Sequence, residues 1–165
     1  MTQRYGLIEE FLDNNNSYKV GIIDGFVKAD IERPFLYTTD ILTCVVLLMV
    51  MDNEAWMIHI DVNNMKYKKI INDFLNTNEF KINEVYIFPG VKTNFLILSN
   101  IESIFIDRNI RFYTVSPFND DRYSNTGGSI VYRFDKEKLY FFGIDSDGFV
   151  CDYDLSLNNE KISKK

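Results

Sequence analysis

The sequence contains a single His, two Cys, three Pro and one Trp among 165 residues. Two Cys cannot build a disulfide framework or a four-Cys zinc site, and one His excludes the common metal centres that use several imidazoles. We therefore expect neither a bound metal nor a cofactor. Any catalysis that depends on an imidazole must use His59, because the chain has no second histidine.

Positive charge is also scarce: 18 basic residues stand against 24 acidic ones, for a net charge of −6. Such a surface repels nucleic acid and anionic membranes, so neither is an expected partner. The longest apolar run, Val45–Met51, is too short to cross a bilayer, and residues 1–4 lead into an acidic segment rather than a secretory signal. With only two Cys, this favours a reducing, cytoplasmic setting. Delivery of the protein into another cell would leave no recognisable signal in the sequence, so this possibility stays open. The oligomeric state also stays open.

Hydrophobic residues make up 46% of the chain and charged residues 25%, which is typical of a globular protein. The length, with no linker or repeat, predicts a single domain over residues 1–165. Strands outnumber helices and both helices lie mid-chain, which favours an α+β domain with helices flanking a central sheet or sandwich. The expected strands cover residues 20–27, 44–51, 55–60, 84–88, 112–115, 129–134, 139–144 and 148–153, and the expected helices cover residues 65–75 and 99–108, the second with Ser99 as N-cap and Glu102 completing a capping box.

The segment 44–60 is predicted to form a β-hairpin, because two apolar runs flank the turn-forming residues 52–54. If the turn is residues 52–53, His59 faces Val46, and Cys44 lies two positions further along on the same face. Diagonal neighbours of this kind are about 7–8 Å apart at Cα. A turn at residues 53–54 keeps the same parity, whereas a three-residue loop would put Cys44 and His59 on opposite faces.

A Cys–His pair is the minimum for thiolate catalysis, in which the imidazole takes the thiol proton and the thiolate attacks a carbonyl carbon. Buried Cys and His residues also occur in ordinary cores, so the pair alone permits a packing role. The second cysteine, Cys151, is interpreted as a packing residue rather than a resolving thiol. A third group usually orients the far ring nitrogen, and the nearby candidates are Thr38, Thr39, Asp40, Thr43 and Asp61.

Four segments form a longer pattern around the pair. Thr38-Thr-Asp-Ile-Leu-Thr-Cys44 precedes a buried strand, and His59 follows 15 residues after the cysteine. Downstream come Glu84-Val-Tyr-Ile-Phe-Pro-Gly90, a helix and strand over residues 100–112, and a Gly-Gly hairpin over residues 127–140. The pattern, over residues 38–142, resembles the Cys–His glutamine deamidase superfamily. Members include the CheD chemoreceptor deamidases, the catalytic domain of cytotoxic necrotizing factors and the protein N-terminal asparagine amidohydrolases.

Two departures from CheD proteins concern the positions beside the pair. CheD proteins usually have Gly-Ser before the cysteine and an apolar stretch after the histidine, where this chain has Leu42-Thr43 and Ile60-Asp61. Thr-Cys and His-x-Asp are closer to the asparagine amidohydrolases, which puts a chemoreceptor substrate in doubt more than the chemistry. The resemblance implies a CheD-like fold with Cys44 as nucleophile, His59 as base and then acid, and Thr38 orienting His59. It also implies substrate-binding roles for Thr43, Asp61, Gly90 and Gly128.

These observations lead to the hypothesis of a cofactor-independent amidohydrolase that deamidates an exposed Gln or Asn of a protein substrate. The reaction would release ammonia and pass through a thioester on Cys44. Two alternatives stay open. One is a catalytically inactive protein-binding domain on the same scaffold, and the other is a thiol protease or transglutaminase-type enzyme.

Overall fold

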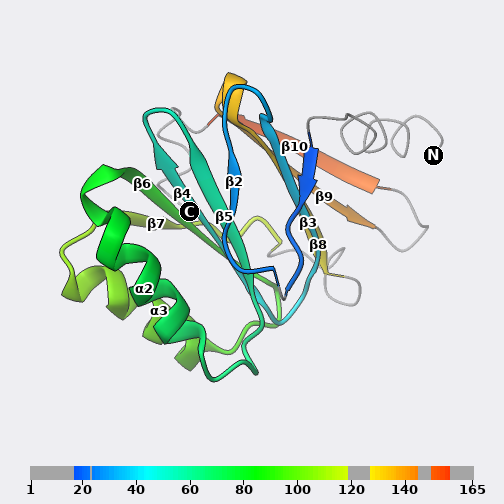
Figure 1. The fold of residues 1–165 in the computed structure, drawn as a ribbon. Coiled ribbons are helices and arrows are strands. Elements are labelled where there is room, and N and C mark those ends of the chain that lie inside the picture. The colour runs from blue at the N-terminus through cyan, green and yellow to red at the C-terminus, as the bar shows by residue number, and fades with distance from the viewer. Residues whose placement is uncertain (1–16, 23, 119–126, 145–149, 157–165) are drawn as a thin grey trace.

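Two five-stranded sheets pack face to face as a sandwich, and two helices cover the outer face of one of them (Figure 1). The computed structural model describes residues 17–22, 24–118, 127–144 and 150–156. The α+β architecture with flanking helices is therefore confirmed. Within these described ranges, no helix has both the length and the apolar character needed to cross a membrane.

The first sheet has the strand order β1-β3-β8-β9-β10, and its only parallel pair is β1 with β3 among the described strands. The β8–β9 hairpin turns through a short 3-10 helix, η3 (Phe134–Lys136). The strands are β1 (Ser17–Lys19), β3 (Phe35–Ile41), β8 (Gly128–Arg133), β9 (Lys138–Ile144) and β10 (Val150–Ser156).

The second sheet has the strand order β2-β5-β4-β6-β7, with β6 and β7 parallel and the other neighbours antiparallel. Its central strand is β4, which pairs with β5 on one side and β6 on the other. The strands are β2 (Val27–Ala29), β4 (Val45–Met51), β5 (Ala55–Ile60), β6 (Ile82–Pro89) and β7 (Phe112–Thr114).

Strand β4 is buried at every residue because both of its faces are covered. Val46 and Leu48 face the first sheet, whereas Val45 and Leu47 face the helices. The helices are α2 (Tyr67–Asn78) and α3 (Phe95–Asp107), with the short 3-10 helix η1 (Glu79–Lys81) after α2. The two covered faces explain why residues 45–51 form a near-continuous apolar run, which predicted a strand buried on both faces.

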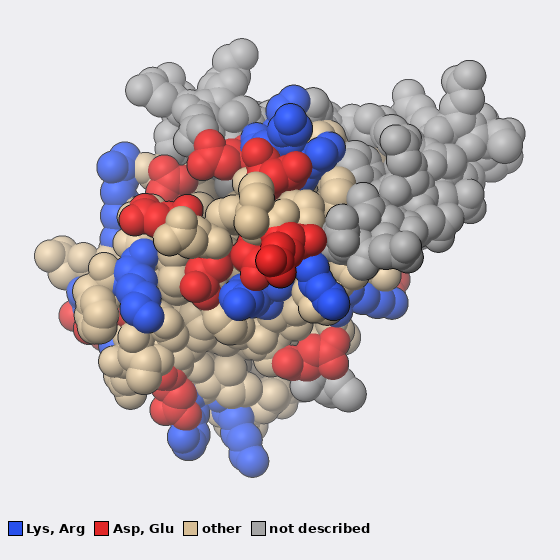
Figure 2. Space-filling model, turned by 45° about the horizontal axis from the view of Figure 1, so that its top comes forward, with Lys and Arg blue, Asp and Glu red and all other residues tan. Residues whose placement is uncertain are grey.

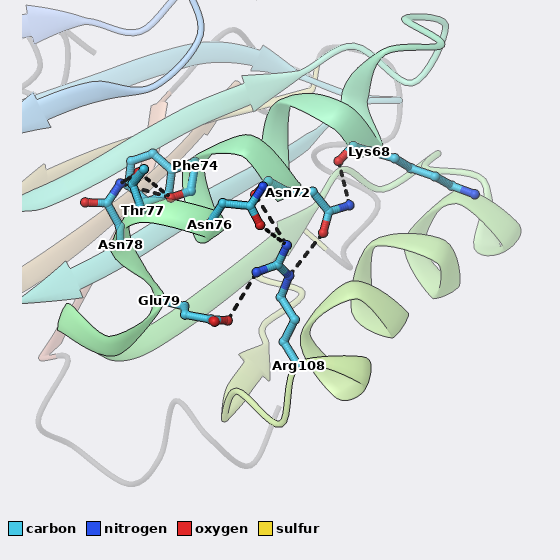
Figure 3. Close-up of polar contacts among 8 residues, drawn as sticks. All are labelled: Lys68, Asn72, Phe74, Asn76, Thr77, Asn78, Glu79 and Arg108. Atoms are coloured by element: carbon cyan, nitrogen blue, oxygen red, sulfur yellow. Dashed lines mark hydrogen bonds and ion pairs between the residues drawn. The ribbon is translucent and has the colours of Figure 1, made fainter.

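Residue Arg108, at the end of α3, fastens the two helices together (Figure 3). Its guanidinium donates to the Asn72 side chain (3.1 Å), to the Asn76 side chain (2.7 Å) and to Glu79 (3.2 Å). Helix α2 has no basic residue in its own last turn, so the Arg108 cation complements the negative end of the α2 dipole from outside. These hydrogen bonds join the end of α3 to the second half of α2 and to η1.

The predicted strand over residues 20–27 is wrong, because this segment turns and carries the chain from β1 to β2. The Asp24 N–H donates to the Gly21 carbonyl (3.2 Å), and the Asp24 carboxylate accepts from the Gly21 N–H (2.8 Å). Gly25 follows with φ of 69°, in the left-handed region. Apolar residues are present, but local Asp–Gly hydrogen bonding overrides their strand preference.

The predicted start of the second helix is also wrong. Helix α3 begins at Phe95, and its N-cap is Asn94, whose side chain accepts from the Leu96 N–H (2.8 Å). Ser99 lies inside the helix, and Glu102 accepts from Thr114 (2.7 Å) instead of closing a capping box. The remaining predicted elements are present with ends shifted by a few residues, while residues 148 and 149 lie outside the described residues.

Candidate active site

The β4–β5 hairpin has the predicted two-residue turn, with the Met51 N–H donating to the Glu54 carbonyl (2.9 Å). Val46 lies directly opposite His59 in this register. Cys44 comes one residue before β4 and two before Val46, so it lies on the same face of the hairpin as His59. The predicted hairpin register is confirmed by the Val46–His59 pair, and the face of His59 and Val46 is turned toward the first sheet.

Thr38 reaches His59 across the gap between the sheets. Thr38 lies on β3 of the first sheet, and its Oγ1 is 2.6 Å from Nδ1 of His59 on the second. The Thr38 hydroxyl also donates to the Val20 carbonyl, at 2.7 Å. Thr38 is 1% exposed and His59 2% exposed, so this chain of hydrogen bonds is shielded from solvent.

The direction of these hydrogen bonds fixes the tautomer of His59. A carbonyl oxygen can only accept, so the single hydroxyl proton of Thr38 points to Val20. The hydroxyl oxygen must then accept from His59, which places a proton on Nδ1. The lone pair of the neutral ring is therefore on Nε2, and this atom has no hydrogen-bond partner among the described residues. A buried, unpaired imidazole lone pair is a base without a proton donor.

Burial lowers the pKa of His59, because the protein interior disfavours the charged ring. The carboxylates of Asp40 and Asp61 act in the opposite direction and raise it in part. His59 is thus held neutral at rest, while two nearby negative charges favour the imidazolium once a proton arrives.

The Cys44 side chain is 8% exposed, and burial raises the pKa of its thiol. A hydrogen bond from the Thr43 side chain and one from the Val62 N–H lower this pKa in part, whereas the Asp61 carboxylate raises it further. No hydrogen bond joins Cys44 to Nε2 of His59 within the described part of the chain. At rest, the site holds a neutral thiol and a neutral imidazole on one face of the hairpin.

The backbone of Cys44 is fixed from two directions. Its carbonyl accepts from the Gly90 N–H (3.0 Å) and from the Thr93 hydroxyl (2.8 Å). A Cβ on Gly90 would lie 2.3 Å from the Leu42 carbonyl oxygen, so only glycine permits this approach. Sequence reasoning did not identify Thr93, which is 49 residues from Cys44 and belongs to no local motif.

A β-bulge precedes the site on β3. The register with β8 shifts by one residue between Thr38 and Ile41, so residues 39 and 40 of β3 together oppose a single residue of β8. Asp40, in this bulge, has φ of 61°. Both Thr38 and Ile41 are therefore buried, although regular alternation over an odd spacing would turn one of them outward.

The other predicted third residues form no hydrogen bond to the imidazole within the described part of the chain. The Thr39 hydroxyl donates to Asp40 (3.1 Å), and the Asp61 carboxylate accepts from the Asn63 N–H (2.9 Å). Thr43 is exposed beside Cys44. Among the described residues, Thr38 alone hydrogen-bonds to the His59 ring.

Of the four residues expected to bind substrate, Thr43 and Asp61 lie beside the pair, and the two glycines are packed inside. A Cβ on Gly128 would lie 2.1 Å from the Phe118 ring. Close packing explains the need for glycine at positions 90 and 128. The side chain of Cys151, in β10, lies outside the described residues.

Two clefts meet at His59. The larger, about 440 Å³, is lined by Ile22 and Gly25 on one side, by Tyr67 and Ile70 of α2 on another, and by residues 58–61 and Asn64. The smaller, about 200 Å³, is lined by residues 19–22, 38–40 and His59. Cys44 is not in the lining of either cleft, and the residues that line both are Ile22 and His59.

No protein-family model matches this chain, and no curated protein matches it significantly. The described residues also contain no group of three or more His, Cys, Asp or Glu side chains placed to hold a metal ion. Inference about function therefore depends on the geometry of the site.

Proposed function

We propose that the protein is a thiol-dependent amidohydrolase that deamidates a Gln or Asn side chain of a protein substrate. The supporting observation is the hydrogen-bonded chain from the Val20 carbonyl through Thr38 to Nδ1 of His59, which leaves Nε2 as a free base on the same face of the hairpin as Cys44. This is the arrangement that a Cys–His pair needs, with the third group bound to the far nitrogen.

The first half of the reaction transfers the acyl group to Cys44. His59 Nε2 takes the thiol proton while Sγ attacks the amide carbon, forming a C–S bond and a tetrahedral oxyanion. The resulting imidazolium is stabilised by the charges of Asp40 and Asp61. It protonates the amide nitrogen, the C–N bond breaks, ammonia leaves, and a thioester remains.

Water completes the cycle. His59 Nε2 takes a proton from a water molecule, whose oxygen attacks the thioester carbon. The C–S bond then breaks, the sulfur recovers a proton from the imidazolium, and the substrate leaves as a carboxylic acid, which loses its proton to the solvent. No redox partner or cofactor enters this balance.

The second candidate is a catalytically inactive binding domain, and specific observations favour it. The Cys44 thiol is buried with a raised pKa, lies in neither cleft and makes no hydrogen bond to Nε2. These facts describe a thiol that is neutral at rest. A proton transfer triggered by substrate is compatible with them, because catalytic hydrogen bonds often tighten only when substrate binds.

Ammonia release from a Gln- and Asn-rich unfolded protein such as casein tests the proposal. The wild-type chain should release ammonia, Cys44→Ala should release none, and Cys151→Ala should match the wild type. Ammonia release that survives in Cys44→Ala would refute the assignment of the nucleophile. No release by the wild type from casein or a panel of folded proteins would favour the binding domain.

The mass of the product separates the related thiol chemistries. Deamidation raises the mass of an intact substrate by about 1 Da per site, because a carboxyl group replaces a carboxamide. A thiol protease would cut the chain instead, and a transglutaminase would add an amine. Intact-mass spectrometry of the same reaction, with and without a primary amine, distinguishes the three.

A further inference from the structure

One edge of strand β5 has no paired strand among the described residues where it passes the site. Strand β2 pairs with β5 only from Val27 opposite Met57 to Ala29 opposite Ala55. Strand β5 continues to Ile60 and stays paired with β4 on its other side. Before Val27, the chain leaves this edge for the first sheet, where the Val20 N–H donates to the Tyr37 carbonyl (2.8 Å; Figure 1). Beyond Met57, this edge is therefore unpaired within the part of the chain that the structure describes.

The backbone of His59 faces this open edge. In an antiparallel hairpin, hydrogen-bonded and non-hydrogen-bonded pairs alternate, and the bond from Met51 to Glu54 sets the phase. Met51 and Glu54 form a hydrogen-bonded pair, and pairs at odd distances from it along β5 are not hydrogen-bonded. His59, opposite Val46, is five positions beyond Glu54, so its pair with Val46 is not hydrogen-bonded. Its N–H and C=O point away from β4, toward the β2 side. Neither has a partner among the described residues.

Three polar groups of one nearly buried residue thus lack partners among the described residues: the N–H, the C=O and Nε2 of His59. Unpaired buried backbone groups are rare because they are costly. The cleft of about 440 Å³ lies beside them, within the usual range of ligand sites. A neighbouring N–H and C=O on a strand edge match the backbone of an extended peptide.

We propose that the substrate segment docks in this cleft as an added β-strand on β5, with the target Gln or Asn opposite His59. This inference rests on the proposed deamidase function and defines its substrate class: an extended, exposed segment rather than a helix. The N–H and C=O of the target residue pair with those of His59. Paired residues of a sheet share a face, so the target side chain lies on the side of the imidazole and Cys44.

The same geometry specifies the flanking residues of the substrate. Side chains on either side of the target point to the opposite face of the sheet, where Ile58 and Ile60 lie in the apolar cluster beneath α2. Tyr67 and Ile70 of α2 complete this wall of the cleft. The site should therefore prefer a Gln or Asn with apolar neighbours on both sides.

Calorimetric binding of capped peptides to the Cys44→Ala protein tests the docking without turnover. Two probes contain Leu-Gln-Leu or Leu-Asn-Leu between glycines, and we expect at least one to bind. N-methylation of the target residue removes the donor to the His59 C=O and should weaken binding about tenfold or more. N-methylation of the following Leu alters an N–H on the outer side and should change binding less than about threefold.

A matched pair of protein variants locates the cleft. Ile22→Asp puts a charge in its wall, whereas Ile31→Asp alters an equally large exposed side chain in the β2–β3 turn. The first should weaken binding about tenfold, and the second should match the parent. Failure of both peptides to bind, or equal effects of the two methyl groups, overturns the docking.

The docking and the deamidase chemistry fail in different ways. Ammonia release by the wild type with no sensitivity to target-residue N-methylation would keep the chemistry and overturn the added strand. Binding with that sensitivity, but no ammonia from either peptide or from protein substrates, would keep the added strand and overturn the chemistry.

Discussion

The two ends of the sandwich each bury a polar side-chain atom without a partner among the described residues: Nε2 of His59 at one end and the Tyr132 hydroxyl at the other. Tyr132 lies near the hairpin-turn end of the molecule, on β8 two residues before η3. His59 lies at the end where β5 runs toward α2 (Figure 1). Both residues are almost completely buried, so their burial does not distinguish them.

The surroundings of Tyr132 and His59 distinguish the two residues. Burial raises the pKa of Tyr132, and the carboxylates of Glu137, Glu84 and Asp135 raise it further, so the phenol stays neutral at any ordinary pH. Figure 2 shows acidic side chains gathered on the surface that includes the hairpin-turn end, with basic ones beside them. At the other end, Thr38 fixes the proton of His59 on one nitrogen and leaves the other as a base. An unpaired atom gains a chemical use only when its neighbours define its protonation.

Removing the Thr38 hydroxyl should produce the largest effect. Thr38→Val leaves the Val20 carbonyl and Nδ1 of His59 unpaired, which should cost about 2 kcal/mol of unfolding free energy. Ammonia release should fall about 100-fold, because the tautomer is no longer fixed. Urea denaturation and steady-state kinetics measure the two effects. Thr38→Ser keeps the hydroxyl and should recover most of the activity; equal losses in both variants would show that the methyl group matters instead.

Protonation of His59 should give an intermediate effect. Its folded pKa lies below the unfolded value of 6.5, so the unfolded chain binds more protons in the window below pH 6.5. Stability contributed by the neutral ring is full above pH 6.5 and is lost as pH falls toward the folded pKa, by at most about 1.4 kcal/mol per pH unit. Denaturation between pH 5 and 7.5 measures this slope. His59→Gln should flatten it, and an unchanged slope in that variant would assign it to carboxylates.

Removing the Tyr132 hydroxyl should have the smallest effect. Tyr132→Phe deletes a buried hydroxyl that has no partner to lose, so the unfolding free energy should stay constant or rise by up to about 1 kcal/mol. Denaturation detects the change, and ammonia release should equal that of the wild type. A loss above about 1 kcal/mol would mean that the hydroxyl makes an essential contact, and the contrast between the two ends would fail.

The hairpin was predictable because its determinants are local. Turn-forming residues 52–54 between two apolar runs predicted the hairpin, and the two-residue turn, one of the alternatives, puts Cys44 and His59 on one face by the period of two. The doubly buried β4 was predictable from composition in the same way. These features need only neighbours along the chain.

The remaining errors and omissions have long-range or competing local causes. The Thr38–His59 contact spans 21 residues and joins two sheets, and among several hydroxyl and carboxyl candidates only the packing of the sheets selects Thr38. Asn94 begins α3 ahead of the false capping box at Ser99, since both residue types cap helices. The open edge beside His59 depends on where β2 begins, and the Gly21–Asp24 turn that precedes β2 looked like part of a strand.

In the proposed deamidation, the Val20–Thr38–His59 chain of hydrogen bonds also bears on the speed of turnover. A proton that arrives on Nε2 leaves Nδ1–H, the Thr38 oxygen and the Val20 carbonyl bonded as before. The imidazole can thus change charge without breaking a bond to the scaffold or rotating its ring. Little reorganisation accompanies each proton transfer, and the same anchored ring is ready for the next one.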